Sequence, residues 1–457
     1  MRTGLIAVTS LGLASILLSV PSPASAQEEW VIYVNPCFDG KGNVPGGGCS
    51  VQPGANNARE YQTDLAAMPG VLPEFSHGQA VFDQVVECVS QVYAPFNVRV
   101  VDTEPPPTTN YHMAIIAGTP QDVGLPAGVG GIGSVFCNNP LTNRISFNFD
   151  IWGADVDMIC QVIAQESAHT FGLGHAFHCS DPMTYLTIAG MRCGRTFFRD
   201  RNFECGEFTA GSPQCSCSGP AQNSHRALLG ALGANPDPNS VPGPTVTLQG
   251  LTQDQVVQNG FRVTATAEDI RGVDRVEFWV NGTERFTEMG NGLGTVKNPW
   301  VWVTPTDLAD GYIDLEVKAY NDLEVETISA VTLLKGAPCE TEATCSAGQF
   351  CEDGRCKFPI ATGEQGDVCS AGTDCISGLC PLEGDSGFCS KNCDPNSLLD
   401  ECGQGFECLT AGAQGYCWPE SSGGCGCAAG SDGKAPWGGL LLVVGVALVL
   451  RRRRRRK

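Results

Sequence analysis

Basic residues are scarce in this chain. Of its 457 residues, 28 are Lys or Arg and 49 are Asp or Glu, which gives a formal net charge of -21. Removal of residues 1–26 and 428–457 would take away nine cations and one acid and leave a net charge near -29. Such a surface repels nucleic acid and anionic lipid, so no nucleic-acid partner is expected. Calcium binding by the acidic loops stays open.

Apolar segments stand at both ends of the chain. Residues 1–26 contain one cation (Arg2), an apolar stretch over 5–20, and Ala-Ser-Ala before Gln27, a pattern that predicts a cleavable export signal. Residues 435–450 carry no charge and are followed by six arginines and a lysine, which predicts an apolar transmembrane helix with a cationic stop. Because this segment is shorter than the ~20 residues that span a bilayer comfortably, a permanent anchor and a transient one both stay open.

The last segment, residues 421–457, resembles the MYXO-CTERM sorting signal. It has Cys425-Gly426-Cys427, a spacer of small residues, a short apolar helix and an arginine cluster, in that order. The resemblance implies processing near the cysteines and delivery to the cell surface or outer membrane, with release as a further possibility. The alternative is an ordinary single-span tail anchor.

Cysteine is absent from the middle of the chain. Ten of the 24 cysteines precede residue 220, fourteen follow residue 338, and none lies between. Even numbers in an exported chain predict disulfides rather than free thiols, and the distribution predicts three regions. The pairing cannot be deduced from sequence, although Cys179 with Cys193 is one suggestion. Residues 337–420 are rich in Cys, Gly, Ser and Asp, cannot bury a large core, and are predicted to form a disulfide-stapled stalk.

Periodicity predicts an α+β domain over residues 27–235. Apolar alternation predicts strands at 30–35, 96–101, 111–117, 132–137 and 144–150, and helical spacing predicts a helix over 79–93. A second helix is expected to begin near Asp155 and Asp157, because acids favour a helix N-terminus. A third is expected over 223–232. The predicted order is one strand, a helix, four strands and the second helix.

A proline-rich linker (236–243) separates this region from a second domain. Residues 244–336 alternate apolar and polar residues in short runs broken by Asn-Gly and Asp-Gly, which predicts a β-sandwich. The run from Gly272 to Gly282 resembles bacterial immunoglobulin-like domains. We expect this domain to be a spacer or a binding module, because nothing in it suggests catalysis.

Residues 161–185 contain a candidate metal-binding motif. They match H-E-x-x-H-x-x-G-x-x-H followed by a Met-turn (residues 180–185, around Met183), except that Gln165 stands in place of the first histidine. Side chains four apart share one face of a helix, so residues 165 and 169 can face one ion with Glu166 beside them. Gly172 allows the chain to turn, and His175 can return as a third ligand.

These residues, with Met183 and Tyr185, resemble the metzincin clan of zinc endopeptidases. The resemblance implies a zinc site, with Gln165, His169 and His175 as ligands and Met183 beneath the metal. It also implies hydrolysis of a protein or peptide substrate by zinc-activated water, with Glu166 as general base and then acid. Tyr185 would stabilise the transition state, and residues 131–136 would be the edge strand that pairs with an extended peptide.

Three interpretations of Gln165 stay open. In the first, its amide oxygen binds zinc, more weakly than an imidazole would, and the enzyme works. In the second, His178 replaces it as the third ligand. In the third, the chain is a non-catalytic surface adhesin or binding protein on a protease-like scaffold.

Overall fold

The computed structural model describes residues 29–38, 47–137, 143–191, 194–290, 297–383, 386–393, 402, 405–411 and 414–419. The predicted export signal (1–26) and the predicted sorting tail (421–457), with its apolar segment and arginine cluster, lie outside these residues. Among the described residues, no helix is both long and apolar enough to cross a membrane.

A five-stranded sheet in the order β5-β1-β6-β8-β7 forms the centre of the N-terminal domain. The first four strands in this order run parallel, and β7 pairs antiparallel with β8 at the edge. Their bounds are β1 Trp30–Asn35, β5 Val98–Val101, β6 His112–Ile116, β7 Gly131–Ile132 and β8 Ile145–Asn148. The domain is therefore α/β rather than the predicted α+β, because its sheet is mostly parallel.

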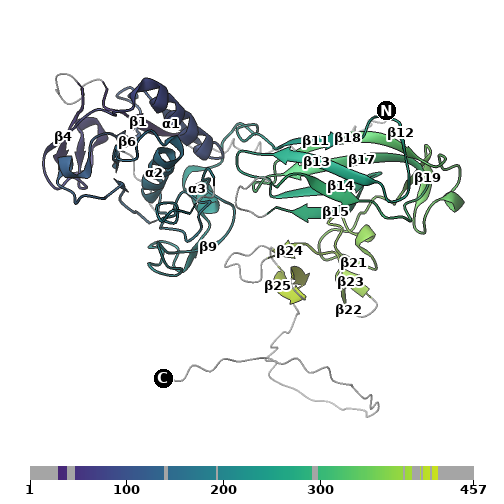
Figure 1. Ribbon diagram of the computed structural model, residues 1–457. Helices are drawn as coiled ribbons and strands as arrows, with labels where there is room; N and C mark the ends of the chain where they lie inside the picture. Colours follow the sequence, from purple (N-terminus) through teal and green to yellow (C-terminus); the bar gives the residue numbers. More distant parts are fainter. Residues whose placement is uncertain are drawn as a thin grey trace, which may run out of the picture.

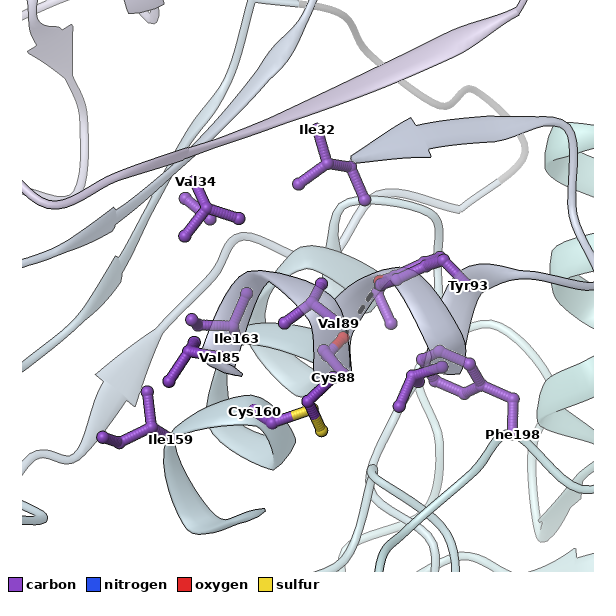
Figure 2. Close-up of a cluster of buried hydrophobic side chains, with 14 of the residues drawn as sticks. Ile32, Val34, Val85, Cys88, Val89, Tyr93, Ile159, Cys160, Ile163 and Phe198 are labelled. Carbon is purple, nitrogen blue, oxygen red and sulfur yellow. Dashed lines mark hydrogen bonds between the residues drawn. A yellow bond between two sulfur atoms is a disulfide. The ribbon is translucent and has the colours of Figure 1, made fainter. Parts of the chain in front are cut away.

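Helices α1 (Gly78–Tyr93) and α2 (Val156–His169) cover one face of this sheet (Figure 1). Ile32 and Val34 of β1 point toward them, as expected for alternate residues of a strand. Figure 2 shows these side chains against both helices, together with the disulfide between Cys88 of α1 and Cys160 of α2. The packing fixes α2, which carries the motif, to the sheet.

The opposite face of the sheet is covered by an insertion that the sequence analysis did not predict. Val31 and Tyr33, the alternate residues of β1, pack with Val51 and Leu72 of this insertion. It forms a three-stranded sheet in the order β3-β2-β4. Its strands are β2 Cys49–Pro53, β3 Gln62–Thr63 and β4 Gly70–Leu72, and the disulfide Cys37–Cys49 ties it to the end of β1.

The predicted element order is confirmed apart from this insertion. The predicted strand over 132–137 is wrong in extent, since β7 covers only Gly131–Ile132 and residues 133–136 are irregular. The third helix, α3, runs from Ser224 to Leu232 and is capped by the Asn223 side chain, which accepts from the Arg226 amide. A short hairpin precedes it, formed by β9 Phe203–Glu204 and β10 Ala221–Gln222.

The second domain is a β-sandwich, as predicted. One sheet has the order β11-β13-β16 and the other β12-β18-β17-β14-β15. Alternate residues of β17 are buried between the sheets around Trp300 and Phe278. The strands are β11 Thr245–Gln249, β12 Gln255–Val257, β13 Arg262–Glu268, β14 Arg275–Val280, β15 Thr283–Met289, β16 Trp300–Val303, β17 Gly311–Tyr320 and β18 Glu326–Lys335.

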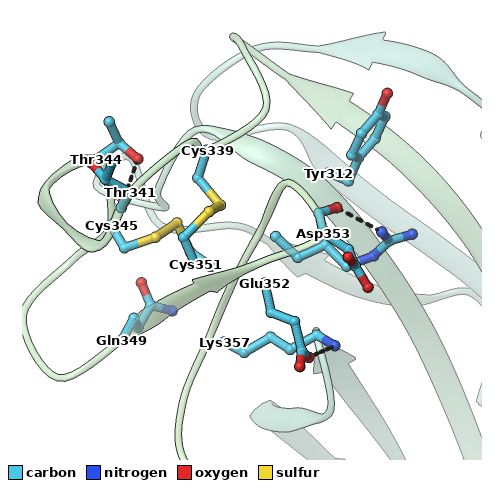
Figure 3. The surroundings of a disulfide bond; sticks show 12 residues. Tyr312, Cys339, Thr341, Thr344, Cys345, Gln349, Cys351, Glu352, Asp353 and Lys357 are labelled. Atoms are coloured by element: carbon cyan, nitrogen blue, oxygen red, sulfur yellow. Dashed lines mark hydrogen bonds and ion pairs between the residues drawn. A yellow bond between two sulfur atoms is a disulfide. The ribbon is translucent and has the colours of Figure 1, made fainter.

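The stalk consists of three small modules with one disulfide pattern. In each, the first cysteine bonds the third and the second bonds the fourth; the pairs are Cys339–Cys351 with Cys345–Cys356, Cys369–Cys380 with Cys375–Cys389, and Cys393–Cys408 with Cys402–Cys417. Figure 3 shows the first module, where Lys357 pairs with Glu352 at 2.7 Å. The strands are β19 Phe350–Glu352, β20 Arg355–Lys357, β21 Val368–Cys369, β22 Leu382–Glu383, β23 Ser386–Phe388, β24 Asn392–Cys393, β25 Phe406–Ala411 and β26 Gln414–Pro419.

Short 3-10 helices complete the described secondary structure, at Ala58–Glu60, Pro120–Val123, Glu342–Thr344 and Gly372–Asp374.

Candidate metal centre

Helix α2 places the motif in the interior of the domain. The Asp155 side chain caps the helix by accepting from the Met158 amide at 3.1 Å, which satisfies a free backbone donor of the first turn. The apolar face of the helix packs into the core through Ile159 and Ile163. One turn farther on, Gln165, Glu166 and His169 are all buried, with 3%, 5% and 6% of their surface exposed.

The chain reverses immediately after α2, at Gly172. This residue has φ +96, a left-handed conformation that only glycine adopts without strain. Gly174 follows, and a Cβ atom there would lie 2.8 Å from Cys215. The buried amide of Gln222 accepts from Gly174 N and donates to Gly174 O, both at 2.8 Å. This turn brings His175 back toward α2.

His169 and His175 face each other with their Nε2 atoms. His169 Nε2 lies 3.1 Å from His175 Nε2. The Nδ1 atom of each ring donates a hydrogen bond. His169 Nδ1 donates to the Leu173 carbonyl at 2.7 Å, and His175 Nδ1 donates to Glu207 Oε1 at 2.9 Å. Carbonyl and carboxylate oxygens only accept, so each Nε2 presents a lone pair to the other.

Burial lowers the pKa of both His169 and His175 to about 4, so the two imidazoles are neutral at physiological pH. Two neutral rings with facing lone pairs repel each other unless a cation lies between them. Two zinc ligands at ~2.0–2.1 Å in tetrahedral geometry stand about 3.3 Å apart, close to the distance found here. A histidine ligand typically donates its second N–H to a carbonyl or carboxylate, as both rings do. The donor set therefore fits zinc.

Gln165 lies one turn before His169 and contacts the Met-turn. Its Nε2 donates to the Thr184 carbonyl at 3.4 Å, and among the described residues its amide oxygen accepts no hydrogen bond. Gln161, a further turn back, donates to the same carbonyl at 3.0 Å and to Thr187 Oγ1 at 2.8 Å. The Gln165 oxygen is thus the polar atom of this side chain that remains available to a cation.

Glu166 is buried beneath the edge strand. Burial raises its pKa to about 8, although a hydrogen bond from the Gly133 amide lowers it in part. Its Oε2 lies 3.9 Å from His169 Nε2. β7 and the residue after it cross α2 closely: a Cβ at Gly131 would lie 2.7 Å from Glu166 Cγ, and one at Gly133 would lie 2.2 Å from the Glu166 carbonyl oxygen.

Met183 and Tyr185 lie beside His175. Met183 is fully buried, and its carbonyl accepts from the Ala176 amide at 2.9 Å, next to His175. The Tyr185 ring lies 4.3 Å from the His175 ring, centroid to centroid. Burial, reinforced by the negative charge of Glu166, raises the pKa of Tyr185 to about 12, so its hydroxyl stays protonated.

His178 makes its contacts elsewhere. Its ring stacks on Phe203 at 4.0 Å, and its Nδ1 lies 2.9 Å from Ser180 Oγ. The structure therefore brings together Gln165, Glu166, His169, His175 and Tyr185 and leaves His178 outside this group.

The cysteines near the motif are disulfide partners, as predicted. Cys160 bonds Cys88, and Cys179 is also disulfide-bonded; Cys193, suggested as its partner, lies outside the described residues. The groups of at least three His, Cys, Asp or Glu that are spaced to share one ion, among the described residues, consist of stalk cysteines. All of these cysteines are in disulfides, so we assign them no metal.

Sequence reasoning missed Glu207, Gln222 and Gln161. Glu207 and Gln222 are remote from the motif in sequence, and the fold brings them to His175 and Gly174. A loop with two disulfides carries Glu207: Cys205–Cys215 closes it, and Cys137–Cys217 ties it to the segment after β7. Of the three, only Gln161 could have been predicted from sequence, because it stands one helical turn before Gln165 on the same face of the helix.

Comparison with known proteins identifies one region. Residues 244–317 match the family model of a bacterial Ig domain, so the β-sandwich is a bacterial immunoglobulin-like domain. No curated protein matches the chain. An immunoglobulin-like domain together with many disulfides indicates an extracellular protein.

Several solved structures share local similarity with the chain. Fibronectin(III)-like modules of Clostridium thermocellum CbhA are 24% identical over 20% of this chain and 46% of theirs, with a TM-score of 0.16. A Jonesia denitrificans lytic polysaccharide monooxygenase is 9% identical over 20% of this chain and 77% of its own, with a TM-score of 0.17. OgpA from Akkermansia muciniphila is 10% identical over 50% of this chain and 64% of its own, with a TM-score of 0.15. The chain spans less than half of the first of these, and TM-scores this low inform neither fold nor function.

Proposed function

We propose that the N-terminal domain is a metzincin-like zinc endopeptidase. The observation that carries the proposal is the pair of neutral imidazoles whose Nε2 atoms lie 3.1 Å apart with both Nδ1–H groups already donated. His169 and His175 would hold the ion with the amide oxygen of Gln165. Zinc supplies a Lewis acid that polarises the peptide carbonyl and makes hydroxide available near neutral pH.

The remaining residues supply proton transfer and positioning. Glu166 Oε2 lies 3.9 Å from His169 Nε2, so its carboxylate would be placed to accept a proton from the attacking water and to pass it to the leaving amine. The protonated Tyr185 hydroxyl can donate to the oxyanion that develops on the substrate. Glu207 fixes the tautomer of His175, so that Nε2 keeps its lone pair.

The substrate in this proposal is an extended peptide. β7 is the edge strand of the sheet, and beyond its pairing with β8 it can accept a further strand in β-augmentation. The Gly133 amide hydrogen-bonds Glu166, so the strand edge and the proposed general base are adjacent.

We also propose where the protein is located after export. The sequence patterns at 1–26 and 421–457 support export, followed by attachment to the cell surface or outer membrane through the C-terminal tail.

A peptide-library digest with the purified, disulfide-intact protein tests the proposed activity. We expect cleavage that a chelator abolishes, zinc restores and Glu166→Gln reduces by about 10²–10⁴-fold. Glu204→Gln, an exposed acid on β9, is the control and should leave the rate unchanged. Cleavage that survives Glu166→Gln contradicts the mechanism. Zinc binding without any cleavage favours the non-catalytic binding protein.

A further inference from the structure

A buried ion pair of the immunoglobulin-like domain lies against the N-terminal domain. Arg271, in the loop between β13 and β14, donates through Nε and Nη2 to the two carboxylate oxygens of Asp322 at 2.7 and 2.8 Å. The Arg271 and Asp322 side chains are only 2% and 7% exposed. A two-point pair of this kind is directional, so it fixes the geometry of the two loops that carry it.

The same pair bonds to residues of the N-terminal domain. Arg271 Nη2 donates to the Phe198 carbonyl at 2.9 Å, and the Arg271 guanidinium lies 4.9 Å from the centroid of the Phe197 ring. In return, Arg199 Nη1 donates to the Arg271 carbonyl and lies 3.4 Å from Asp322 Oδ1. The Asp322 carboxylate thus pairs with two guanidiniums, one from each domain.

Arg199 connects this interface to the Met-turn. Its amide donates to Asp181 Oδ2 and its Nε to the Ser180 carbonyl, both at 3.4 Å. The other oxygen of Asp181 accepts from the Met183 amide at 2.9 Å. The contacts therefore run from Asp322 through Arg199 and Asp181 to Met183, beside His175.

We propose that the immunoglobulin-like domain positions the candidate metal centre, and that Arg271 and Asp322 fix the Met-turn through Arg199 and Asp181. Flexible relative motion is the usual expectation for domains joined by a short linker. Here the interface buries two guanidiniums that share one carboxylate, and an altered domain orientation would leave these charges without partners. The domain is accordingly part of the working unit rather than the spacer or separate binding module expected from sequence.

Hydrogen exchange in the full-length protein tests this positioning directly. Asp322→Asn keeps the side-chain shape and removes the charge; Glu324→Gln does the same two residues away, at an exposed acid that pairs with Arg275 inside the same domain. We expect exchange of the Met183 and Ala176 amides to accelerate at least tenfold in Asp322→Asn and to stay unchanged in Glu324→Gln. Unchanged exchange in a folded Asp322→Asn variant overturns the proposal. If that variant does not fold, Arg271→Lys, which keeps the charge but loses the two-point geometry, is judged by the same criterion.

A cobalt-substituted site separates positioning from general stability. The visible absorption of Co²⁺ reports ligand geometry, so we expect Asp322→Asn to alter the spectrum and Glu324→Gln to leave it as in the wild type. Faster exchange with an unaltered spectrum would mean that the domain stabilises the Met-turn without positioning the ligands, which overturns the proposal. The consequence for the site rests on the proposed function. If the wild type binds no cobalt, that function fails, whereas the exchange experiment still decides whether the domain holds the Met-turn.

Discussion

Residue 165 sets the chemistry of the candidate centre. An amide oxygen is a neutral, harder ligand than an imidazole nitrogen and binds zinc more weakly. In this structure the Gln165 amide nitrogen donates a hydrogen bond to the Thr184 carbonyl of the Met-turn. The amide oxygen is therefore the polar atom of the side chain that remains available to a cation. In the proposed site, the glutamine at position 165 would be a weaker ligand than a histidine, while His169 and His175 keep their facing geometry.

Replacement of Gln165 by histidine should therefore strengthen metal binding. We expect Gln165→His to lower the zinc dissociation constant at least tenfold, or about 1.4 kcal/mol, because an imidazole replaces an amide oxygen. Competition with a chromophoric chelator measures this change. Gln84→His, at an exposed glutamine of α1, is the matched control and should have no effect. Equal affinity in the wild type and Gln165→His would show that residue 165 does not face the ion.

Sequence alone predicted much of the site at the residue scale. Glu166, His169, His175 and Tyr185 come together because the motif encodes one helical face and one return turn. Glu207 could not be predicted, since its contact with His175 depends on a disulfide-closed loop that lies 32 positions farther along the chain.

His112 is buried on β6, and its Nε2 lies 3.0 Å from Ser146 Oγ. Burial lowers the pKa of His112 from 6.5 to about 3, and the positive charge of Arg144 makes a smaller contribution in the same direction. The unfolded chain therefore binds a proton that the folded state excludes. The stability that this neutral histidine contributes is present above pH 6.5 and is lost as the pH falls from 6.5 toward 3.

This linkage predicts a pH dependence specific to the N-terminal domain. Between pH 7 and pH 5 the free energy of unfolding should fall by about 2 kcal/mol more in the wild type than in His112→Gln. Native-state hydrogen exchange of β6 amides, corrected for the intrinsic exchange rates, reports this domain separately from the others. An identical decrease in both proteins would exclude His112 as the cause.

At the scale of elements, the close crossing of β7 over α2 determines the site. The order of strands and helices was predictable because apolar periodicity is strong in each of them. The insertion β2 to β4 was missed because its strands are short and lack clear alternation. The length of β7 was missed because the pairing with β8 ends at Ile132, where the chain approaches the backbone of Glu166.

Gly133→Ala tests this crossing. A Cβ would lie 2.2 Å from the Glu166 carbonyl oxygen, so the segment that follows β7 must move away from α2. We expect a loss of ~1–3 kcal/mol in stability, measured by denaturant unfolding of the N-terminal domain, together with weaker zinc binding. Gly230→Ala in α3 is the control: apart from its chain neighbours and the backbone of its own helix, no atom lies within 4 Å of the added Cβ, and a gain of ~0.5–1 kcal/mol is expected. Equal effects of the two substitutions would contradict the proposed crossing.

At the scale of the whole molecule, the chain combines an α/β domain, a bacterial immunoglobulin-like domain and three modules with a repeated disulfide pattern. The three regions were predictable from the cysteine distribution and from the strand alternation. The pairing within the stalk was not, because many pairings of the same cysteines are compatible with one sequence. Nor was the interface between the first two domains, because Arg199, Arg271 and Asp322 are distant in sequence and carry no shared motif.

The central claim is that His169 and His175, with Gln165, hold one zinc ion. Its most direct test is the metal content of the purified, disulfide-intact protein, measured by inductively coupled plasma mass spectrometry beside two variants. We predict about one zinc per chain in the wild type and in His178→Ala, and loss of the metal in His175→Ala. A wild-type protein without zinc, or a loss in His178→Ala equal to that in His175→Ala, would contradict the claim.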